Sequence, residues 1–340
     1  MLELADIFRL YGPAYIKMYG DRMMPSHKRV ISDIVNCRTP ALGGQLYECS
    51  HCHEFEYSFH SCMNRHCPKC MKNKASQWLE KERQRLLPVP YFLVTFPLPA
   101  ELRKVTRSNQ KIIYGIAFEA SAKAMQLLAS DPKHLNGEIG LLGVLHTWKR
   151  NLDYHPHLHY LVPAGAISFD KRNWTRTKYD FFLPVKALSI IFRAKFRDAL
   201  KEADMDLFKS VPPQVWRKAW VVHCQPAGMG KEVLKYMAPY IYRVAISNKN
   251  LLKLENDLVT FKFKHSKTNK WCIRTLPVFH FIYLFLQHVL PSGFKKVRHY
   301  GFLSSKQKST LALLQYILGT VEWQPPEEPL SSTVKHLCPK

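Results

Sequence analysis

The sequence predicts an α+β protein, in which a central antiparallel sheet with flanking helices follows a helical, zinc-binding N-terminal region. Two observations carry this prediction. Runs of aromatic and β-branched residues closed by proline or glycine alternate with longer helical stretches. Six of the nine cysteines lie between Cys37 and Cys70. We expect a helical and zinc-binding domain over residues 1–88, a sheet-containing catalytic domain over 89–250, and a basic C-terminal region over 251–340.

The composition indicates a folded protein with a polyanionic partner. Hydrophobic residues make up 46% of the 340-residue chain, more than a disordered chain carries. Lysine and arginine number 50 against 26 aspartates and glutamates, so the formal charge is +24, and nucleic acid is the commonest partner for such an excess. No apolar run approaches the roughly 20 residues that span a bilayer, and no basic amphipathic helix stands out. The acidic, helix-like opening is unlike a signal peptide, so we expect a cytoplasmic, reducing location.

The cysteine-rich stretch predicts a zinc site, because clustered cysteines in a reducing compartment bind metal more often than they form disulfides. Cys49 and Cys52 form one C-x-x-C motif, Cys67 and Cys70 form a second, and 14 residues separate them. Two tight turns at this spacing can bring four thiolates onto one tetrahedral zinc ion. The other donors nearby either form a second zinc site or are packing cysteines and surface histidines. These donors are Cys37, His60, Cys62 and His66.

A strand that carries paired histidines predicts a catalytic metal site. Residues 90–99 (PYFLVTFPLP) read as a buried strand, 100–130 as a helical stretch and 140–147 as a second strand. In the third strand, residues 155–162 (HPHLHYLV), His157 and His159 point to one face and can chelate a single divalent ion. His146 supplies a third ligand if the second and third strands form a hairpin in the right register, and His155 is the alternative.

Two tyrosines are the candidate nucleophiles. Residues 185–203 predict an inserted helix and 220–223 a short strand, and the segment 231–252 follows. In that segment Tyr236 and Tyr240 stand four residues apart, so on a helix their hydroxyls share one face. Pro239 either kinks this helix or begins a new one. Taken alone, this spacing favours an aromatic stripe packed in a core, and only the histidine strand shifts the interpretation.

The histidine–apolar–histidine strand followed by Y-x-x-x-Y resembles the HUH endonucleases, specifically the two-tyrosine transposases of rolling-circle insertion sequences, which are related to the Helitron transposases. Five stretches across residues 37–304 look like successive blocks of that family, in family order. They are CRTPALGGQLYEC, HSCMNRHCPKC, HTWKRNLDYHPHLHYLVPAG, YIYRVAISN and RHYGFLSS. The resemblance implies an HUH endonuclease-like domain over 89–250, with His157 and His159 as metal ligands and Tyr236 and Tyr240 as nucleophiles.

The resemblance also implies a reaction and its partners. A tyrosine would attack the scissile phosphate of single-stranded DNA, leaving a 5′-phosphotyrosine and a free 3′-hydroxyl, and the second tyrosine would permit another strand transfer. The DNA would be the ends of a mobile element and its target, in a bacterial cytoplasm and at the nucleoid when bound. Imidazole with oxygen donors suits Mn²⁺, with Mg²⁺ as the abundant alternative, and Zn²⁺ would be structural.

Basic stretches with interleaved aromatic residues are the expected DNA contacts, because rings stack on unpaired bases while cations follow the backbone. Each stretch alone is more often a solvated surface, and the overall charge and the nuclease-like core favour DNA contact; Arg243 could hold a phosphate or pair with a carboxylate. The predicted contacts are Arg243, Lys262, Lys264, Lys295, Lys296 and Arg298.

Three other functions fit parts of the sequence. A plasmid relaxase or replication initiator would use the same chemistry, but it does not need the zinc block or the C-terminal block. A histidine-triad nucleotide hydrolase would account for His155, His157 and His159, but it needs neither the positive charge nor the tyrosines. A non-enzymatic zinc-finger DNA-binding protein would leave the histidine strand without a role.

Overall fold

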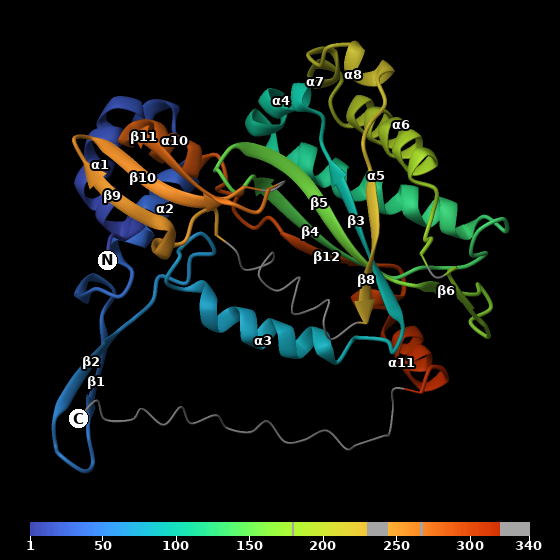
Figure 1. The fold of residues 1–340 in the computed structure, drawn as a ribbon, viewed down its shortest axis with the longest axis horizontal. Helices are drawn as coiled ribbons and strands as arrows, with labels where there is room; N and C mark the ends of the chain where they lie inside the picture. Colours follow the sequence, from blue (N-terminus) through green and yellow to red (C-terminus); the bar gives the residue numbers. More distant parts are fainter. Residues whose placement is uncertain (179, 230–243, 266–267, 320–340) are drawn as a thin grey trace.

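The computed structural model describes residues 1–178, 180–229, 244–265 and 268–319 (Figure 1). Its helices are α1 (Leu4–Tyr19), α2 (Pro25–Asn36), α3 (Met71–Arg83), α4 (Arg103–Ser108), α5 (Gln110–Ser130), α6 (Val185–Ala203), α7 (Met205–Lys209), α8 (Gln214–Arg217), α10 (Val278–Leu286) and α11 (Lys308–Ile317). Its strands are β1 (Gly44–Glu48), β2 (Phe55–Phe59), β3 (Pro90–Pro97), β4 (Leu141–Trp148), β5 (Tyr154–Pro163), β6 (Gly165–Ile167), β7 (Trp174–Arg176), β8 (His223–Met229), β9 (Leu251–Glu255), β10 (Leu258–Lys264), β11 (Trp271–Pro277) and β12 (Val297–Tyr300).

A five-stranded sheet in the order β12-β4-β5-β3-β8 lies at the centre of the molecule, and every neighbouring pair in it is antiparallel. The predicted hairpin between the second and third strands is present as β4 and β5, and β3 pairs with the other side of β5. The inserted helix predicted over 185–203 is α6. The α+β class with a central antiparallel sheet and flanking helices is therefore confirmed.

The two faces of the central sheet pack against different helices (Figure 1). On one face, Leu158 and Tyr160 of β5 are buried against α5 and α6, and the ring centroid of Phe96 lies 5.0 Å from that of Phe192. On the other face, Leu161 belongs to a hydrophobic cluster that includes residues of α3 and α11. This second face is the one to which the odd-numbered residues of β5 point, because side chains alternate along a strand.

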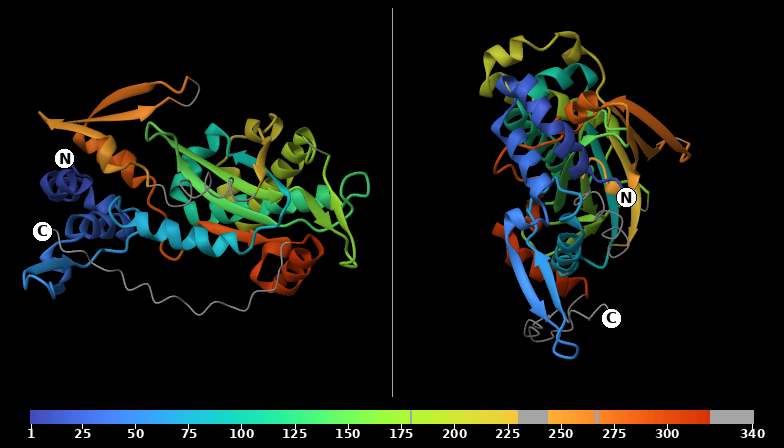
Figure 2. Two further views of the ribbon diagram at one scale, coloured as in Figure 1. Left: turned by 60° about the horizontal axis from the view of Figure 1, so that its bottom comes forward. Right: turned by 90° about the vertical axis from the view of Figure 1, so that its left-hand side faces the viewer.

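The N-terminal helices and the C-terminal sheet share one hydrophobic core. α1 packs against α10, where Phe8 meets Phe285 edge-on with ring centroids 5.4 Å apart. The three-stranded sheet β11-β10-β9 adds Val259 and Phe261 to the same core. Figure 1 and Figure 2 show these elements together at one end of the molecule. Packing thus crosses the domain boundaries expected at residues 88 and 250, and β12, from the basic C-terminal region, forms an edge of the central sheet.

Two predicted elements begin or end elsewhere. The strand expected over 220–223 starts only at His223, because the Trp220 indole donates to the Val215 carbonyl at 2.9 Å and packs against α6. In the segment 231–252, for which a helix was considered, the described residues 244–252 are not α-helical, and Val244 and Ile246 are buried in the core shared with α1. Within the described ranges, no helix is both long and apolar enough to span a membrane.

Candidate metal centres and nucleic-acid interface

Three histidines converge on the central sheet. His146 of β4 and His157 of β5 are directly paired across the hairpin, and His159 follows two residues later on the same face. Their ring centroids are 5.4 Å (His146–His157), 4.9 Å (His146–His159) and 4.7 Å (His157–His159) apart. One nitrogen from each ring lies within 4.8 Å of the other two, a spacing that one metal ion can bridge.

Hydrogen bonds orient these rings. Nδ1 of His157 donates to the backbone oxygen of His155 at 2.7 Å, which leaves Nε2 with a lone pair for a metal. Nδ1 of His159 is hydrogen-bonded to the Thr95 hydroxyl at 3.0 Å. Burial lowers the pKa of His157 to about 4 and that of His159 to about 3, because water no longer stabilises the charged imidazolium. The imidazoles are therefore neutral at pH 7, the form that binds metals.

Of the two candidates for a third ligand, the structure brings His146 into the group and leaves His155 outside it. Arg103 donates to Nδ1 of His155 at 3.2 Å. Three imidazoles on one face fit a first-row divalent ion such as Mn²⁺. Mg²⁺ prefers oxygen donors and fits this set less well.

The histidine group adjoins two residues that the sequence analysis did not single out for this site, Trp148 and His288. The Trp148 ring stacks on His146 at 5.3 Å between centroids, and His288 lies 5.8 Å from Trp148. His288 is 1% exposed and donates from Nε2 to the Leu152 carbonyl at 2.9 Å. A single histidine at the end of an apolar helix gave no sequence signal that separates it from a packing residue.

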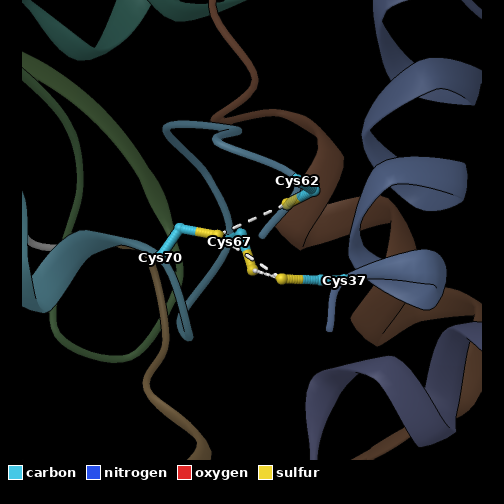
Figure 3. A group of neighbouring side chains, drawn as sticks. All are labelled: Cys37, Cys62, Cys67 and Cys70. Carbon is cyan, nitrogen blue, oxygen red and sulfur yellow. Dashed lines mark hydrogen bonds between the residues drawn. The ribbon is translucent and has the colours of Figure 1, made fainter. Parts of the chain in front are cut away.

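Four cysteines form a second candidate metal centre (Figure 3). Cys37 caps the end of α2, and Cys62, Cys67 and Cys70 come from the loop that leads into α3. The Sγ atom of Cys37 lies 3.4 Å from that of Cys70 and 3.5 Å from that of Cys67. The Sγ atoms of Cys62 and Cys70 lie 3.6 Å apart. All four lie within 4.8 Å of one another, and no disulfide joins them. Four converging thiols with little access to water are the donor set of a structural zinc site.

This grouping differs from the predicted one. The sequence analysis placed Cys49 and Cys52 with Cys67 and Cys70, whereas the structure groups Cys37 and Cys62 with them. The reason is the β1–β2 hairpin, whose five-residue ladder carries Cys49 and Cys52 to its turn, about 16 Å from its base at 3.3 Å per residue. Figure 1 shows this hairpin extending away from the remaining chain. The cysteines closest to the hairpin base form the cluster.

The two histidines considered for a second zinc site do not join the cluster. His60 is exposed, and its backbone pairs with Arg38 and Gly43. His66 accepts a hydrogen bond from the backbone N–H of Leu290 at 3.3 Å. Burial lowers the pKa of His66 to about 3, so it stays neutral and links the cysteine loop to the end of α10.

The outer face of β10 and β11 carries cations beside exposed apolar side chains. Lys262 pairs across the strands with Ile273, and Lys264 pairs with Trp271. Trp271 is 61% and Ile273 69% exposed, and the Lys262 ammonium lies 5.5 Å from the centre of the Trp271 ring. The inner face of the same strands is buried through Val259 and Phe261. We call the outer set of Lys262, Lys264, Trp271 and Ile273 the basic sheet face.

The remaining predicted contacts occupy different environments. Lys295 is exposed. Lys296 is half-buried with its ammonium 4.9 Å from the centre of the Trp148 ring, which places it one ring away from His146. Burial, followed by the charge of Arg65, lowers the pKa of Lys296 to about 7. The Arg298 guanidinium lies over Phe118 at 4.5 Å and over Phe294 at 5.2 Å, an internal packing role that differs from the predicted DNA contact.

The candidate nucleophiles Tyr236 and Tyr240, together with Arg243, lie outside the described residues. The described chain ends β8 at Met229, opposite Pro90. It resumes at Val244, which is buried in the same cluster as Leu152 of the β4–β5 turn.

Comparisons with known proteins point to one family. The model of a family described as putative transposase matches residues 140–310, and that of a transposase zinc-binding domain matches residues 7–98. The putative transposase y4qJ of Sinorhizobium fredii is 39% identical over 338 residues, covering 93% of this chain and 84% of that protein. The transposase for insertion sequence element IS801 of Pseudomonas savastanoi pv. phaseolicola is 25% identical over 293 residues, covering 81% and 70%. No solved structure matches the chain.

Proposed function

The chain belongs to the two-tyrosine HUH family of rolling-circle transposases, and from that premise we propose that it cleaves and rejoins single-stranded DNA by metal-assisted tyrosine attack. The observation that carries the proposal is the convergence of His146, His157 and His159 on one face of the central sheet. The family resemblance identified in the sequence is confirmed by the comparisons, and transposition of an insertion sequence is the process in which the protein takes part.

The three imidazoles are the proposed ligands of Mn²⁺ or Mg²⁺. The chemistry that a divalent ion supplies at such a site is neutralisation of the scissile phosphate and polarisation of its P–O bond. The protein holds the ligands in place through the His155 carbonyl and the Thr95 hydroxyl, which contact the Nδ1 atoms of His157 and His159. Lys296, beside Trp148, places an amino group with a pKa lowered to about 7 on this side of the sheet.

Tyr236 and Tyr240 are the proposed nucleophiles. A phenol has an ordinary pKa near 10, so its proton must leave as the attack begins. The tyrosine oxygen then bonds to phosphorus, the bond to the 3′-oxygen breaks, and that oxygen takes up a proton. The products are a 5′-phosphotyrosine and a free 3′-hydroxyl, which can reverse the reaction on another strand. Two tyrosines permit two such links at once.

The basic sheet face is the proposed path of the unpaired DNA. Trp271 and Ile273 offer a surface on which bases stack, and Lys262 and Lys264 stand opposite them for the phosphates. Arg274 ties this sheet to the β4–β5 turn by donating to the Asp153 carboxylate at 2.9 Å and to the Asn151 carbonyl at 2.7 Å. A strand lying on this face is thereby held in a fixed relation to the histidine hairpin.

The test is formation of a covalent adduct. Labelled single-stranded DNA from the element ends is incubated with the protein and Mn²⁺ or Mg²⁺, and products are resolved on a denaturing gel. We expect an adduct with the wild-type protein that is lost in the Tyr236→Phe/Tyr240→Phe double variant and in His157→Ala. Tyr242→Phe is the matched control and should retain it. An adduct that persists in the double variant would falsify the proposed nucleophiles.

A further inference from the structure

A cavity of about 600 Å³ lies where the N-terminal helices meet α10 and the beginning of α5. It is separate from both metal centres. Its volume is within the range of cavities that hold small organic ligands. Neither the zinc-binding domain nor the proposed catalytic residues account for this cavity.

The walls of the cavity are aromatic. Phe279 meets Tyr15 edge-on with ring centroids 5.5 Å apart and Tyr19 at 6.2 Å. Tyr283 stands on α10 one turn after Phe279, and both Tyr19 and Tyr283 are 39% exposed. Partly exposed rings that line a cavity offer their faces to a flat ligand.

Two buried polar atoms in the cavity lining have no hydrogen-bond partner among the described residues. Gln110 is 5% exposed, and its amide nitrogen donates to the Gln287 carbonyl at 3.3 Å, so its Oε1 acceptor is left over. Nε2 of His27 is likewise buried without a partner. Burial lowers the pKa of His27 to about 4, so the ring is neutral at pH 7. Unsatisfied buried groups are costly, and a ligand with hydrogen-bonding edges would satisfy both.

The charge of the cavity is positive. Arg107 lies 5.5 Å from the centre of the Tyr283 ring and donates to its hydroxyl, and Arg22 also lines the cavity. No aspartate or glutamate is among the described lining residues. The ligand is therefore expected to combine a planar ring that carries hydrogen-bonding groups with a negative charge, which is the chemistry of a nucleotide.

The cavity adjoins the histidine group through short chains of contacts. Gln287, in its lining, is followed by His288, which is hydrogen-bonded to Thr147 beside His146. Arg103, on the same short helix as Arg107, contacts His155. These contacts place the cavity in the same part of the molecule as the histidine group.

We infer that this cavity is a pocket for one unpaired base, with its phosphate, of the single-stranded DNA on which the protein acts. The base inserts between Tyr19, Phe279 and Tyr283, and its edge meets Gln110 and His27. Arg22 and Arg107 hold the phosphate. The inference rests on the proposed function for the identity of the DNA, and it adds a base-specific anchor apart from the site of cleavage.

The experiment uses single-stranded oligonucleotides of the element ends, with 2-aminopurine placed at each position in turn. Stacking in the pocket should quench its fluorescence at one position. Tyr283→Leu should abolish that quenching, and Tyr283→Phe, which keeps a ring, should retain it. Tyr316→Leu is the control, because Tyr316 is 76% exposed on α11 and lies outside the pocket.

A second arm compares intact and abasic strands. An abasic nucleotide at the quenched position should weaken binding about tenfold, the usual effect of losing one stacked base, and Gln110→Leu should weaken the intact strand but not the abasic one. Quenching at no position, or abasic strands that bind as well as intact ones, would overturn the inference. Adducts measured in the same samples separate the two proposals: quenching without an adduct counts against tyrosine attack, and an adduct without quenching counts against the pocket.

Discussion

Leu158 and the two histidines that flank it show how one strand serves two purposes. Leu158 is 1% exposed and packs against the helices behind the sheet, while His157 and His159 point to the opposite face. The alternation that buries the leucine therefore also sets the two imidazoles side by side. His146 joins them because the register pairs it directly with His157.

The third ligand can be tested by metal affinity. We expect His146→Ala to weaken Mn²⁺ binding by roughly tenfold or more, since even outer-shell partners of metal ligands contribute that much. His155→Ala should have a much smaller effect, because His155 stands outside the group and contacts Arg103. Calorimetric titration of both variants with Mn²⁺ measures the difference. Equal losses in the two variants would assign the third ligand to neither.

Gly301 occupies a position that admits no other residue. Its φ is +57°, and a Cβ there would lie 1.7 Å from the carbonyl oxygen of Ile139. This contact sets the turn that follows β12. We expect Gly301→Ala to lower the free energy of unfolding by at least about 2 kcal/mol, because strain and a backbone clash act together. Urea unfolding checks the value, with Gly293→Ala as the control, since Gly293 also has a positive φ of 71° but no atom within 4 Å of the added Cβ.

At the scale of elements, the cysteine loop and the β1–β2 hairpin separate two sets of thiols. Replacing Cys62 or Cys67 with serine should remove about one zinc per chain and lower the thermal midpoint, because a closed thiolate site contributes directly to folding. The Cys49→Ser/Cys52→Ser double variant should keep that zinc. Zinc content and thermal unfolding are measured together. Loss of the zinc in the Cys49→Ser/Cys52→Ser variant, with the zinc retained in Cys62→Ser, would restore the grouping first predicted from the spacing.

The basic sheet face makes a different prediction. Lys262→Ala/Lys264→Ala should weaken binding of single-stranded DNA and reduce the slope of log affinity against log salt by about 1.4, at roughly 0.7 for each phosphate contact. Trp271→Ala should weaken binding about tenfold with little change in the slope, because stacking is not ionic. Titrations at several salt concentrations separate the two effects. Lys201→Ala/Lys209→Ala, two exposed changes at α6 and α7, is the control.

The elements differ in how far the sequence predicts them. β3, β4, β5 and α6 carry local signals, namely alternation, prolines and helical periodicity, and they are found close to the expected residues. The pairing of β12 with β4 and the meeting of Cys37 with Cys70 depend on contacts between distant segments, and local patterns do not encode those contacts. The environment of Arg298 was missed for the same reason, because a cation over two rings looks like a surface charge in sequence.

For the whole molecule, several buried histidines make stability depend on pH. Burial lowers the pKa of His288 to about 4, so the folded protein releases a proton that the unfolded chain binds below about pH 6.5. The stabilisation is complete above pH 6.5 and is lost as the pH falls towards 4. His66 and His27 act in the same direction. We therefore expect the free energy of unfolding to begin falling as the pH drops below about 6.5, before the carboxylates begin to be protonated.

This prediction can be assigned to one residue. Between pH 7 and pH 4 the wild-type protein loses free energy of unfolding, and His288→Gln should reduce this loss by about 2 to 3 kcal/mol. The figure follows from the pKa shift of His288 at about 1.36 kcal/mol per pKa unit. Urea unfolding at the two pH values measures it, and His280→Gln, at an exposed position, should leave the loss unchanged. An unchanged pH dependence in His288→Gln would assign the acid sensitivity to other groups.

The shared core of α1, α2 and α10 has a consequence for synthesis on the ribosome. The helices made first, over residues 4–36, bury their apolar faces against a helix that begins only at Val278. At 5 to 20 residues per second, roughly 10 to 50 s pass before that helix is made. During this interval α1 and α2 can pack against each other, but the apolar surface that α10 covers in the native fold stays exposed. A nascent chain of this transposase is therefore expected to depend on chaperones for most of its elongation, which would couple its yield to the folding capacity of the host cell.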